Sequence, residues 1–231
     1  MAGELLSPML IVIAERSGEF PKKGIYQAKS LFTASNIITV PGRSHIMTKS
    51  IADKFCSEIL LKMITDRKTV LLVDAWPTWK NALKNAGIGE NVFISNIPAG
   101  CTGFVQPCDL YLFRAWKEIV RRFSDRVVLD DIQINLHSRD EIVKLQSLVH
   151  NQLSAQKFKT FLKYCWFKGG YINEEGNEFS NFPHPVKFCF PKNLPACCQR
   201  PNCSDSVLIR CGHCDFYLCF QCFYVNYHIC G

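Results

Sequence analysis

Short, continuous apolar runs separate polar segments in the first half of the chain. Three runs have the length and composition of strands buried inside a sheet: MLIVIA (9–14), VLLV (70–73) and VFI (92–94). Between the first two runs, residues 48–64 carry apolar side chains three or four positions apart. This spacing predicts a helix with Thr48 or Ser50 as its N-cap. Strands that alternate with helices in this way indicate an α/β fold.

The second half of the chain has a helical pattern that gives way to turn residues. Residues 109–123 (DLYLFRAWKEIVRRF) place apolar side chains on one helical face: Leu112, Trp116, Ile119, Val120 and Phe123. A second helix is expected to begin after Ser138, with Glu141 placed as in a capping box, and to break near Ser154. Residues 169–185 are rich in Gly, Asn and Pro, which is typical of a linker.

These patterns predict three parts: an α/β domain at 1–125, a helical segment and linker at 126–196, and a cysteine-rich module at 197–231. With 48% hydrophobic and 20% charged residues, the composition is that of a folded protein rather than a disordered one. The apolar runs are too short to span a membrane, and Glu4 and Pro8 interrupt any N-terminal signal segment. We therefore expect an intracellular protein.

The net charge of +7 is unevenly distributed. From Cys197 onward two arginines balance two aspartates, so the excess lies in residues 1–196. Its densest cluster, residues 113–126 (FRAWKEIVRRFSDR), predicts contact with a polyanion such as DNA. The candidate DNA-facing residues are Arg114, Lys117, Arg121 and Arg122. The alternative is an ordinary solvated helix face.

Eight of the 13 cysteines lie in the last 35 residues, and their close pairing predicts zinc binding, with disulfides as the alternative. The pairs are Cys198 with Cys203, Cys211 with Cys214, Cys219 with Cys222, and His228 with Cys230. Zinc binds four thiolate or imidazole ligands. We expect two structural ions in a cross-brace, the first and third pairs on one ion and the second and fourth on the other. Cys197 is an alternative to Cys198, and His213 is not expected to be a ligand.

Two aspartates lie at positions suited to metal binding. Asp74 ends the strand VLLVD, at the edge where open α/β sheets hold their ligands. Asp109 follows Pro107 at a predicted helix start, and 34 residues lie between the two aspartates. Two carboxylates brought together can share Mg²⁺ or Mn²⁺. In the alternative interpretation, Asp74 merely ends a strand and Asp109 caps a helix.

The segment VLLVDAWPTW, followed by VFISNIPAGCTGFVQPCDLYLFRAWK, resembles the back half of the DDE-superfamily transposase domain of the pogo/Tigger and mariner kind. The family loop Pro-x-x-x-Thr-x-x-x-Gln-Pro-x-Asp is matched by Pro98, Thr102, Gln106, Pro107 and Asp109. Residues 7–26 resemble the preceding strand and Lys/Gly turn, so the resemblance covers about residues 7–125. It implies a partial ribonuclease-H-like fold, a mixed sheet with flanking helices. It also implies two-metal DNA strand transfer, with Asp74 and Asp109 among the catalytic acids.

Two departures from the family pattern bear on catalysis. The family's Asp-Asn-x-Pro-x-His is Asp-Ala-Trp-Pro-Thr-Trp in residues 74–79. The family's first catalytic Asp belongs to an earlier strand, and neither Glu4 nor Glu15 matches it. Its N-terminal helix-turn-helix modules are not found in these residues either. We therefore expect incomplete strand-transfer activity unless an upstream segment or a second chain supplies the missing acid.

The cysteine-rich tail carries two further resemblances. RCGHCDFYLCFQCF resembles a ZZ-type finger, which recognises peptides. LCFQCFYVNYH resembles the end of piggyBac-type transposases, which binds transposon-end DNA or chromatin. The leading interpretation is a transposase-derived nuclear protein that binds nucleic acid. The rival is a zinc-finger module that binds a peptide or chromatin and uses a degenerate domain as its scaffold.

Overall fold

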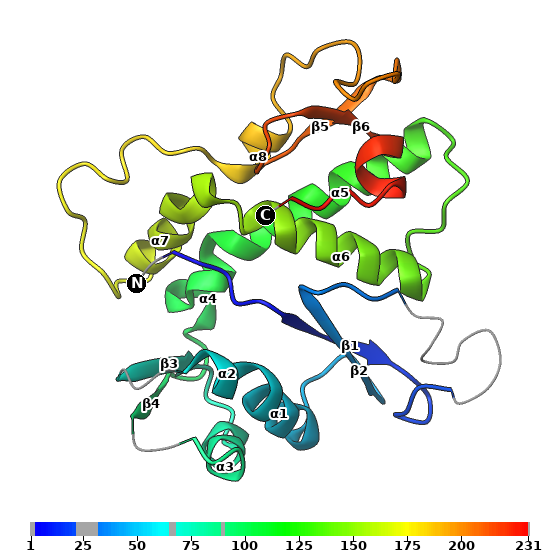
Figure 1. The fold of residues 1–231 in the computed structure, drawn as a ribbon. Helices are drawn as coiled ribbons and strands as arrows, with labels where there is room; N and C mark the ends of the chain where they lie inside the picture. The colour runs from blue at the N-terminus through cyan, green and yellow to red at the C-terminus, as the bar shows by residue number, and fades with distance from the viewer. Residues whose placement is uncertain (1–2, 22–31, 65–67, 89–90, 231) are drawn as a thin grey trace. The chain divides into compact units, whose positions relative to one another are not determined.

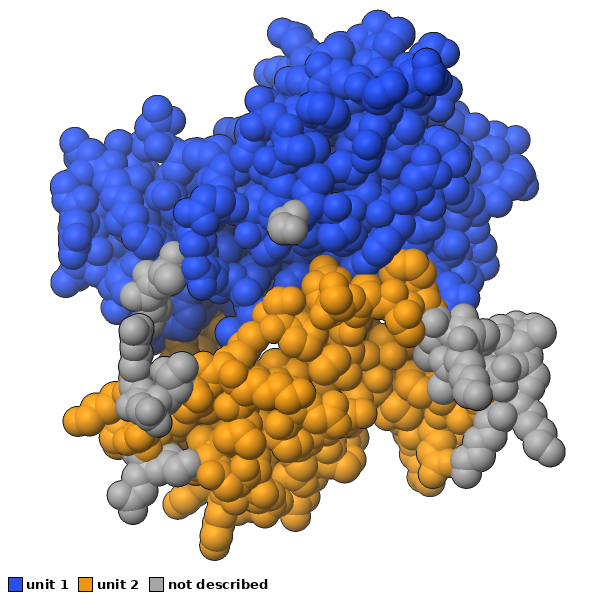
Figure 2. All heavy atoms as spheres, viewed as in Figure 1, with its two compact units in different colours: residues 1–6, 107–231 blue, residues 7–106 orange. Residues whose placement is uncertain are grey.

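The computed structural model describes residues 3–21, 32–64, 68–88 and 91–230. The chain divides into two compact units, one made of residues 7–106 and the other of residues 1–6 and 107–231 (Figure 2). Each unit is described by itself. None of the helices among the described residues is long and apolar enough to cross a membrane.

The predicted strands of the first unit are confirmed, but they form two separate parallel pairs among the described residues (Figure 1). Strand β1 (Met9–Ala14) pairs with β2 (Ile37–Gly42), and β3 (Thr69–Val73) pairs with β4 (Val92–Asn96). The expected mixed sheet is therefore not seen there. Pro41 lies within β2 and has no N–H to donate, which favours an edge position for this strand. The Lys/Gly turn expected at residues 22–24 lies outside the described residues.

The predicted helix after residue 48 is also confirmed. Helix α1 (Lys49–Phe55) continues through a π-helical turn, η2 (Cys56–Leu60), into α2 (Leu61–Met63). Thr48 is its N-cap, because its Oγ1 accepts the Ile51 N–H at 3.4 Å. Helix α3 (Thr78–Asn85) packs against α1 through a small core: Ala52, Cys56, Leu60, Ala82 and Leu83. A short α4 (Thr102–Val105) lies near the end of this unit.

The second unit is built on helices that arise from the predicted amphipathic segments. A π-helical turn, η3 (Cys108–Leu112), leads into α5 (Phe113–Leu129), and α6 (Arg139–Leu153) packs against it. A 3-10 turn, η4 (Gln156–Phe158), then leads into α7 (Lys159–Lys168), and α8 (Pro185–Cys189) follows the linker.

The expected capping box at the start of α6 does not form. Ser138 is the N-cap residue, but its side chain makes no capping hydrogen bond. The carboxylate of Glu141 instead accepts the Tyr224 hydroxyl at 2.5 Å. A tertiary contact has therefore replaced the local one predicted from the sequence.

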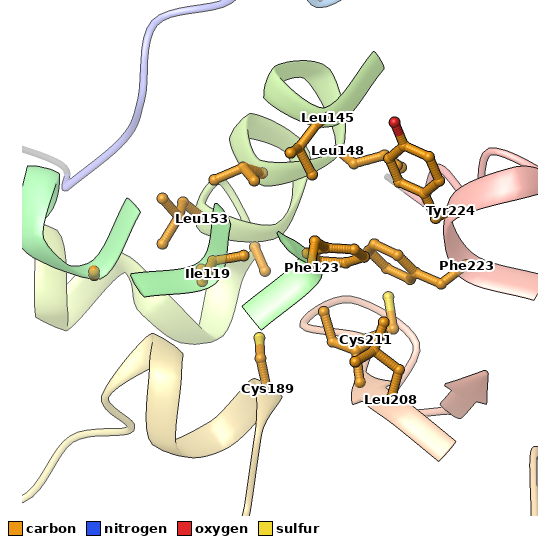
Figure 3. Close-up of a cluster of buried hydrophobic side chains, with 14 of the residues drawn as sticks. Ile119, Phe123, Leu145, Leu148, Leu153, Cys189, Leu208, Cys211, Phe223 and Tyr224 are labelled. Atoms are coloured by element: carbon orange, nitrogen blue, oxygen red, sulfur yellow. The ribbon is translucent and has the colours of Figure 1, made fainter. Parts of the chain in front are cut away.

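The cysteine-rich segment shares its core with these helices. It contains β5 (Val207–Arg210) and β6 (Tyr217–Cys219), which pair antiparallel, and the π-helical turn η5 (Gln221–Val225). The ring of Phe123 on α5 lies 5.5 Å from that of Phe223 and 5.8 Å from that of Tyr224 (Figure 3). All three side chains are buried. One cluster of buried side chains therefore extends from α5, α6 and α7 into the cysteine-rich segment. The domain boundaries at residues 125 and 196 stay a prediction.

Candidate metal centres and acidic residues

The first metal-ligand cluster consists of Cys198, Cys203, Cys219 and Cys222, whose sulfur atoms all lie within 4.8 Å of one another. The Sγ of Cys203 is 3.7 Å from that of Cys219 and 3.7 Å from that of Cys222. The backbone N–H of Cys198 donates to the Asp205 carbonyl, which positions Cys198 in the cluster. Cys219 is the last residue of β6. The first and third sequence pairs therefore meet, although more than ten residues separate them.

The second cluster consists of Cys211, Cys214, His228 and Cys230, again with ligand atoms within 4.8 Å of one another. Nε2 of His228 lies 3.5 Å from Cys214 Sγ and 3.1 Å from Cys230 Sγ. Cys211 follows β5, and a turn carries the chain to Cys214. The second and fourth sequence pairs meet here. Cys197 is exposed and His213 lies outside both groups.

These distances fit tetrahedral metal coordination. With metal–sulfur bonds of about 2.3 Å and metal–nitrogen bonds of about 2.0 Å, tetrahedral ligands lie about 3.8 Å apart for two sulfurs and about 3.5 Å apart for sulfur and nitrogen. The separations of 3.7 Å between Cys203 and Cys219 and of 3.5 Å between Cys214 and His228 match these values, while that of 3.1 Å between His228 and Cys230 is shorter. Each cluster can therefore hold one metal ion.

Burial of the cluster thiols opposes their ionisation. Burial raises the pKa of Cys222 to about 11 and that of Cys230 to about 12. Burial also opposes ionisation of Cys211, but hydrogen bonds, led by that to His228, lower the pKa of this thiol below its usual value. A bound cation would favour the thiolate form of all these ligands, because it compensates their buried negative charge.

Helix α6 supports the second cluster with buried polar side chains. Gln152 is fully buried, donates to Cys211 Sγ at 3.6 Å, and accepts the Gly212 N–H at 2.6 Å. The Asn151 side-chain amide donates to the Cys230 backbone carbonyl at 2.7 Å, and the Asn151 backbone carbonyl lies 2.7 Å from His213 Nε2. The imidazole of His213 is thus used to attach the Cys211–Cys214 turn to α6.

The contact between Arg200 and Nδ1 of His228 is not compatible with a metal ion on Nε2 of the same ring. Arg200 Nη2 lies 2.9 Å from His228 Nδ1. A metal on Nε2 leaves the imidazole proton on Nδ1, and a guanidinium group has only donors. Arg200 must therefore turn away from His228 when the ion binds.

Asp74 lies where the sequence predicted, directly after β3, and it is exposed. Its Oδ1 accepts two hydrogen bonds, from the Trp76 backbone N–H at 3.4 Å and from Trp79 Nε1 at 3.3 Å. These donors hold the carboxylate at the carboxyl end of the strand. The indole contribution had no signal in the sequence, because it depends on how α3 returns toward β3.

Asp109 lies in the first turn of η3 and is half-buried. Its negative charge adds to the effect of burial in raising the pKa of the Cys108 thiol. Asp74 and Asp109 belong to different compact units, so their meeting at one metal ion stays a prediction.

The basic residues of α5 fall into two groups. Arg121 and Arg122 both pair with Glu118, at 2.7 Å and 3.1 Å. Arg114 and Lys117 are exposed and have no ion pair within the described part of the chain. The two groups therefore differ in how readily they can bind a phosphate.

Comparison with protein-family models identifies the family. The model described as DDE superfamily endonuclease matches residues 3–166, more than half of the chain. The chain belongs to the DDE superfamily of endonucleases. A second model, described as Tc5 transposase C-terminal domain, matches residues 166–230 and contains both cysteine clusters. Neither the curated proteins nor the solved structures gave a match.

The two matches together indicate a transposase-derived DNA-binding protein. They confirm the DDE resemblance drawn from Asp74, Asp109 and their flanking motifs. The tail of this DDE superfamily member matches the Tc5 model, and neither expected resemblance, ZZ-type or piggyBac-type, is confirmed.

Proposed function

We propose that this DDE superfamily member binds DNA through the exposed face of α5, which is held in place by a cysteine-rich segment with two structural zinc ions. Within the superfamily, the loop from Pro98 to Asp109 favours the pogo/Tigger and mariner branch and its ribonuclease-H-like fold. A protein with this function acts in the nucleus. Chromatin binding through the tail is the alternative.

The observation that carries this proposal is the division of α5 into two faces. One face buries Ala115, Ile119 and Phe123 against α6 and the cysteine-rich segment. Arg114 and Lys117 lie on the exposed face, together with Arg121 one turn further along. Side chains at this helical spacing are neighbours and can contact successive phosphates.

The first test is DNA binding as a function of salt concentration. Replacing one phosphate-binding residue lowers the slope of log K against log salt by about 1, so Arg114→Gln with Lys117→Gln should lower it by about 2. Lys187→Gln with Lys192→Gln makes the same change in net charge at exposed positions outside α5 and should leave the slope nearly unchanged.

Equal losses in both double variants would show that only net charge matters and would reject the α5 face. Absence of salt-dependent binding in the wild-type protein, together with binding to histone-like peptides, would favour the peptide-binding alternative.

A second candidate function is metal-dependent cleavage of DNA. It rests on Asp74, whose exposed carboxylate at the end of β3 accepts the hydrogen bonds of Trp76 and Trp79 through Oδ1. With Asp109, it would hold Mg²⁺ or Mn²⁺, which supplies Lewis-acid activation of water and of the scissile phosphate.

The expected result for this candidate is Mn²⁺- or Mg²⁺-dependent nicking of supercoiled DNA that Asp74→Asn and Asp109→Asn each abolish. Asp125→Asn, an acid on α5 outside the matched motif, is the control. Nicking that survives both aspartate replacements would rule out this pair as the metal ligands. A preparation that binds DNA without nicking it would support the binding function alone.

A further inference from the structure

The unit of residues 7–106 contains an open groove of about 850 Å³ between α3 and β4. Its lining combines three aromatic and two basic side chains with aliphatic ones; the aromatic and basic residues are Trp76, Trp79, Phe93, Lys80 and Lys84. These elements, with β3, are labelled in Figure 1. Trp76, Pro77 and Trp79 lie within the motif of residues 74–79, but the lysines and Phe93 belong neither to the DDE motif nor to the cysteine clusters.

The two tryptophan rings of the groove contact each other, and Trp79 makes further contacts. The Trp79 ring meets Phe55 edge-on at 5.9 Å and Trp76 at 5.8 Å, and its N–H bonds to Asp74. Trp76 is half-buried, and Phe93 is 52% exposed although it lies in a strand. An exposed aromatic ring beside a hollow offers a face on which another ring can stack.

The charge of the groove is positive. Lys80 and Lys84 lie four residues apart on one face of α3, and both are exposed. Neither has an ion pair among the described residues, and the described lining includes no carboxylate. A partner that combines flat rings with negative charge is complementary to this surface.

We propose that the groove binds an unpaired strand of nucleic acid, with bases stacked on Trp76 and Phe93 and phosphates near Lys80 and Lys84. Bases stack on aromatic side chains whatever their identity, and lysines along the groove follow the backbone. The Trp79–Asp74 hydrogen bond joins the groove to the candidate catalytic carboxylate. The groove would thus hold strand ends or locally opened DNA beside that carboxylate. This inference rests on the proposed DNA-binding function.

The test compares binding of a labelled single-stranded oligothymidine and of a matched duplex by the full chain, using fluorescence anisotropy. Loss of one stacked base typically weakens binding about tenfold, so Trp76→Ala and Phe93→Ala should each lower single-strand affinity about tenfold and change duplex affinity much less. Lys80→Gln with Lys84→Gln should lower the single-strand salt slope by about 1.4, because each phosphate contact contributes about 0.7 on a single strand.

Three controls separate stacking from folding. Trp76→Phe keeps a ring and should keep most of the affinity. Val70→Ala alters the residue paired with Phe93 across the β3–β4 sheet, outside the groove lining. Lys49→Gln with Lys62→Gln repeats the charge change at exposed positions elsewhere in the unit. Circular dichroism of each variant verifies that it is folded.

Unchanged single-strand binding in folded Trp76→Ala and Phe93→Ala would overturn the inference. Losses of single-strand affinity that are equal in the groove variants and in the Val70 and lysine controls would also overturn it. So would a groove that binds a peptide and not the oligothymidine. Duplex binding that depends on Arg114 and Lys117 would survive these failures. The proposed function and the groove can therefore fail separately.

Discussion

Trp79 departs from the family motif but forms a hydrogen bond with the candidate catalytic residue Asp74. From the sequence, Trp79 occupies a position where the family motif has His, and it counted against catalysis. In the structure its indole N–H donates to Asp74 Oδ1 at 3.3 Å. Imidazole and indole rings both carry an N–H donor, so Trp79 places a ring donor beside Asp74 at the position where the family motif has His. The departure at Ala75 leaves no comparable group, because a methyl side chain cannot form hydrogen bonds.

The buried side chain of His150 should make the stability of the unit that contains α6 depend on pH. Its ring is buried, and Nε2 contacts the Leu6 carbonyl at 2.8 Å. Burial lowers the pKa of His150 below the ordinary value of 6.5, and the Leu6 carbonyl only partly offsets this effect. The folded state therefore favours the neutral ring. Its stabilisation is complete above pH 6.5 and is lost as the pH falls from 6.5 toward the lower folded pKa, because the unfolded chain takes up the proton first.

The His150 prediction is measured by thermal unfolding between pH 7.5 and about 5.5, the range below the ordinary histidine pKa. His150→Gln keeps a donor for Leu6 but cannot be protonated, so its melting temperature should fall less than that of the wild type over this range. His137→Gln changes an exposed histidine and should reproduce the wild-type profile. Parallel profiles for wild type and His150→Gln would contradict the prediction.

At the scale of elements, α6 has an unusual composition on the face that it buries. Five polar side chains bond to the cysteine-rich segment or adjoining residues: Glu141, Lys144, Ser147, Asn151 and Gln152. They lie three or four positions apart or next to one another, along one side of the helix. From periodicity alone, such a polar face is predicted to be exposed to solvent. The buried partner lies about 80 residues away in the chain, so no local pattern reveals it.

This interface predicts that removing metal loosens the helices as well as the tail. Without a cation, the clustered thiols lose their shared partner, and the core that joins Phe123 to Phe223 and Tyr224 loses its support. Chelation should raise amide hydrogen exchange in α5, α6 and the cysteine-rich segment. Exchange in α1 and α3, which belong to the other unit, should change little.

The matched variants for this prediction are Cys198→Ser and Cys197→Ser. Cys198 belongs to the first cluster, and its exposed neighbour Cys197 does not. Native mass spectrometry should find two zinc ions in the wild type and in Cys197→Ser, but fewer in Cys198→Ser. Cys198→Ser should also lose about 4 kcal/mol of stability, more than most single substitutions, because loss of a metal is one of the few mechanisms with so large an effect. Equal zinc content and stability in the two variants would contradict the first cluster as a metal site.

At the scale of the whole molecule, the predicted elements were largely confirmed, and their assembly was not. Strands β1, β3 and β4 and helices α1, α5 and α6 appear where apolar periodicity placed them. Periodicity reports which face of an element is buried, but not which element covers it. The separate β1–β2 and β3–β4 pairs, and the packing of the tail on α5 and α6, therefore had no signal in the sequence.

The sequence by itself determined the metal-ligand pairs and the motifs around Asp74 and Asp109, because both depend on residue types a few positions apart. Close pairs such as Cys211 and Cys214 lie on one turn and can meet through local geometry alone. The cross-brace grouping of these pairs was also predicted from the sequence, and the structure brings together the same two sets of residues. Only the tertiary structure showed that α6 supports the second cluster with buried hydrogen bonds. It also assembled the aromatic groove beside Asp74 from α3 and β4. Contacts between distant segments depend on how the chain packs to bury its apolar surface, which no short stretch of sequence encodes.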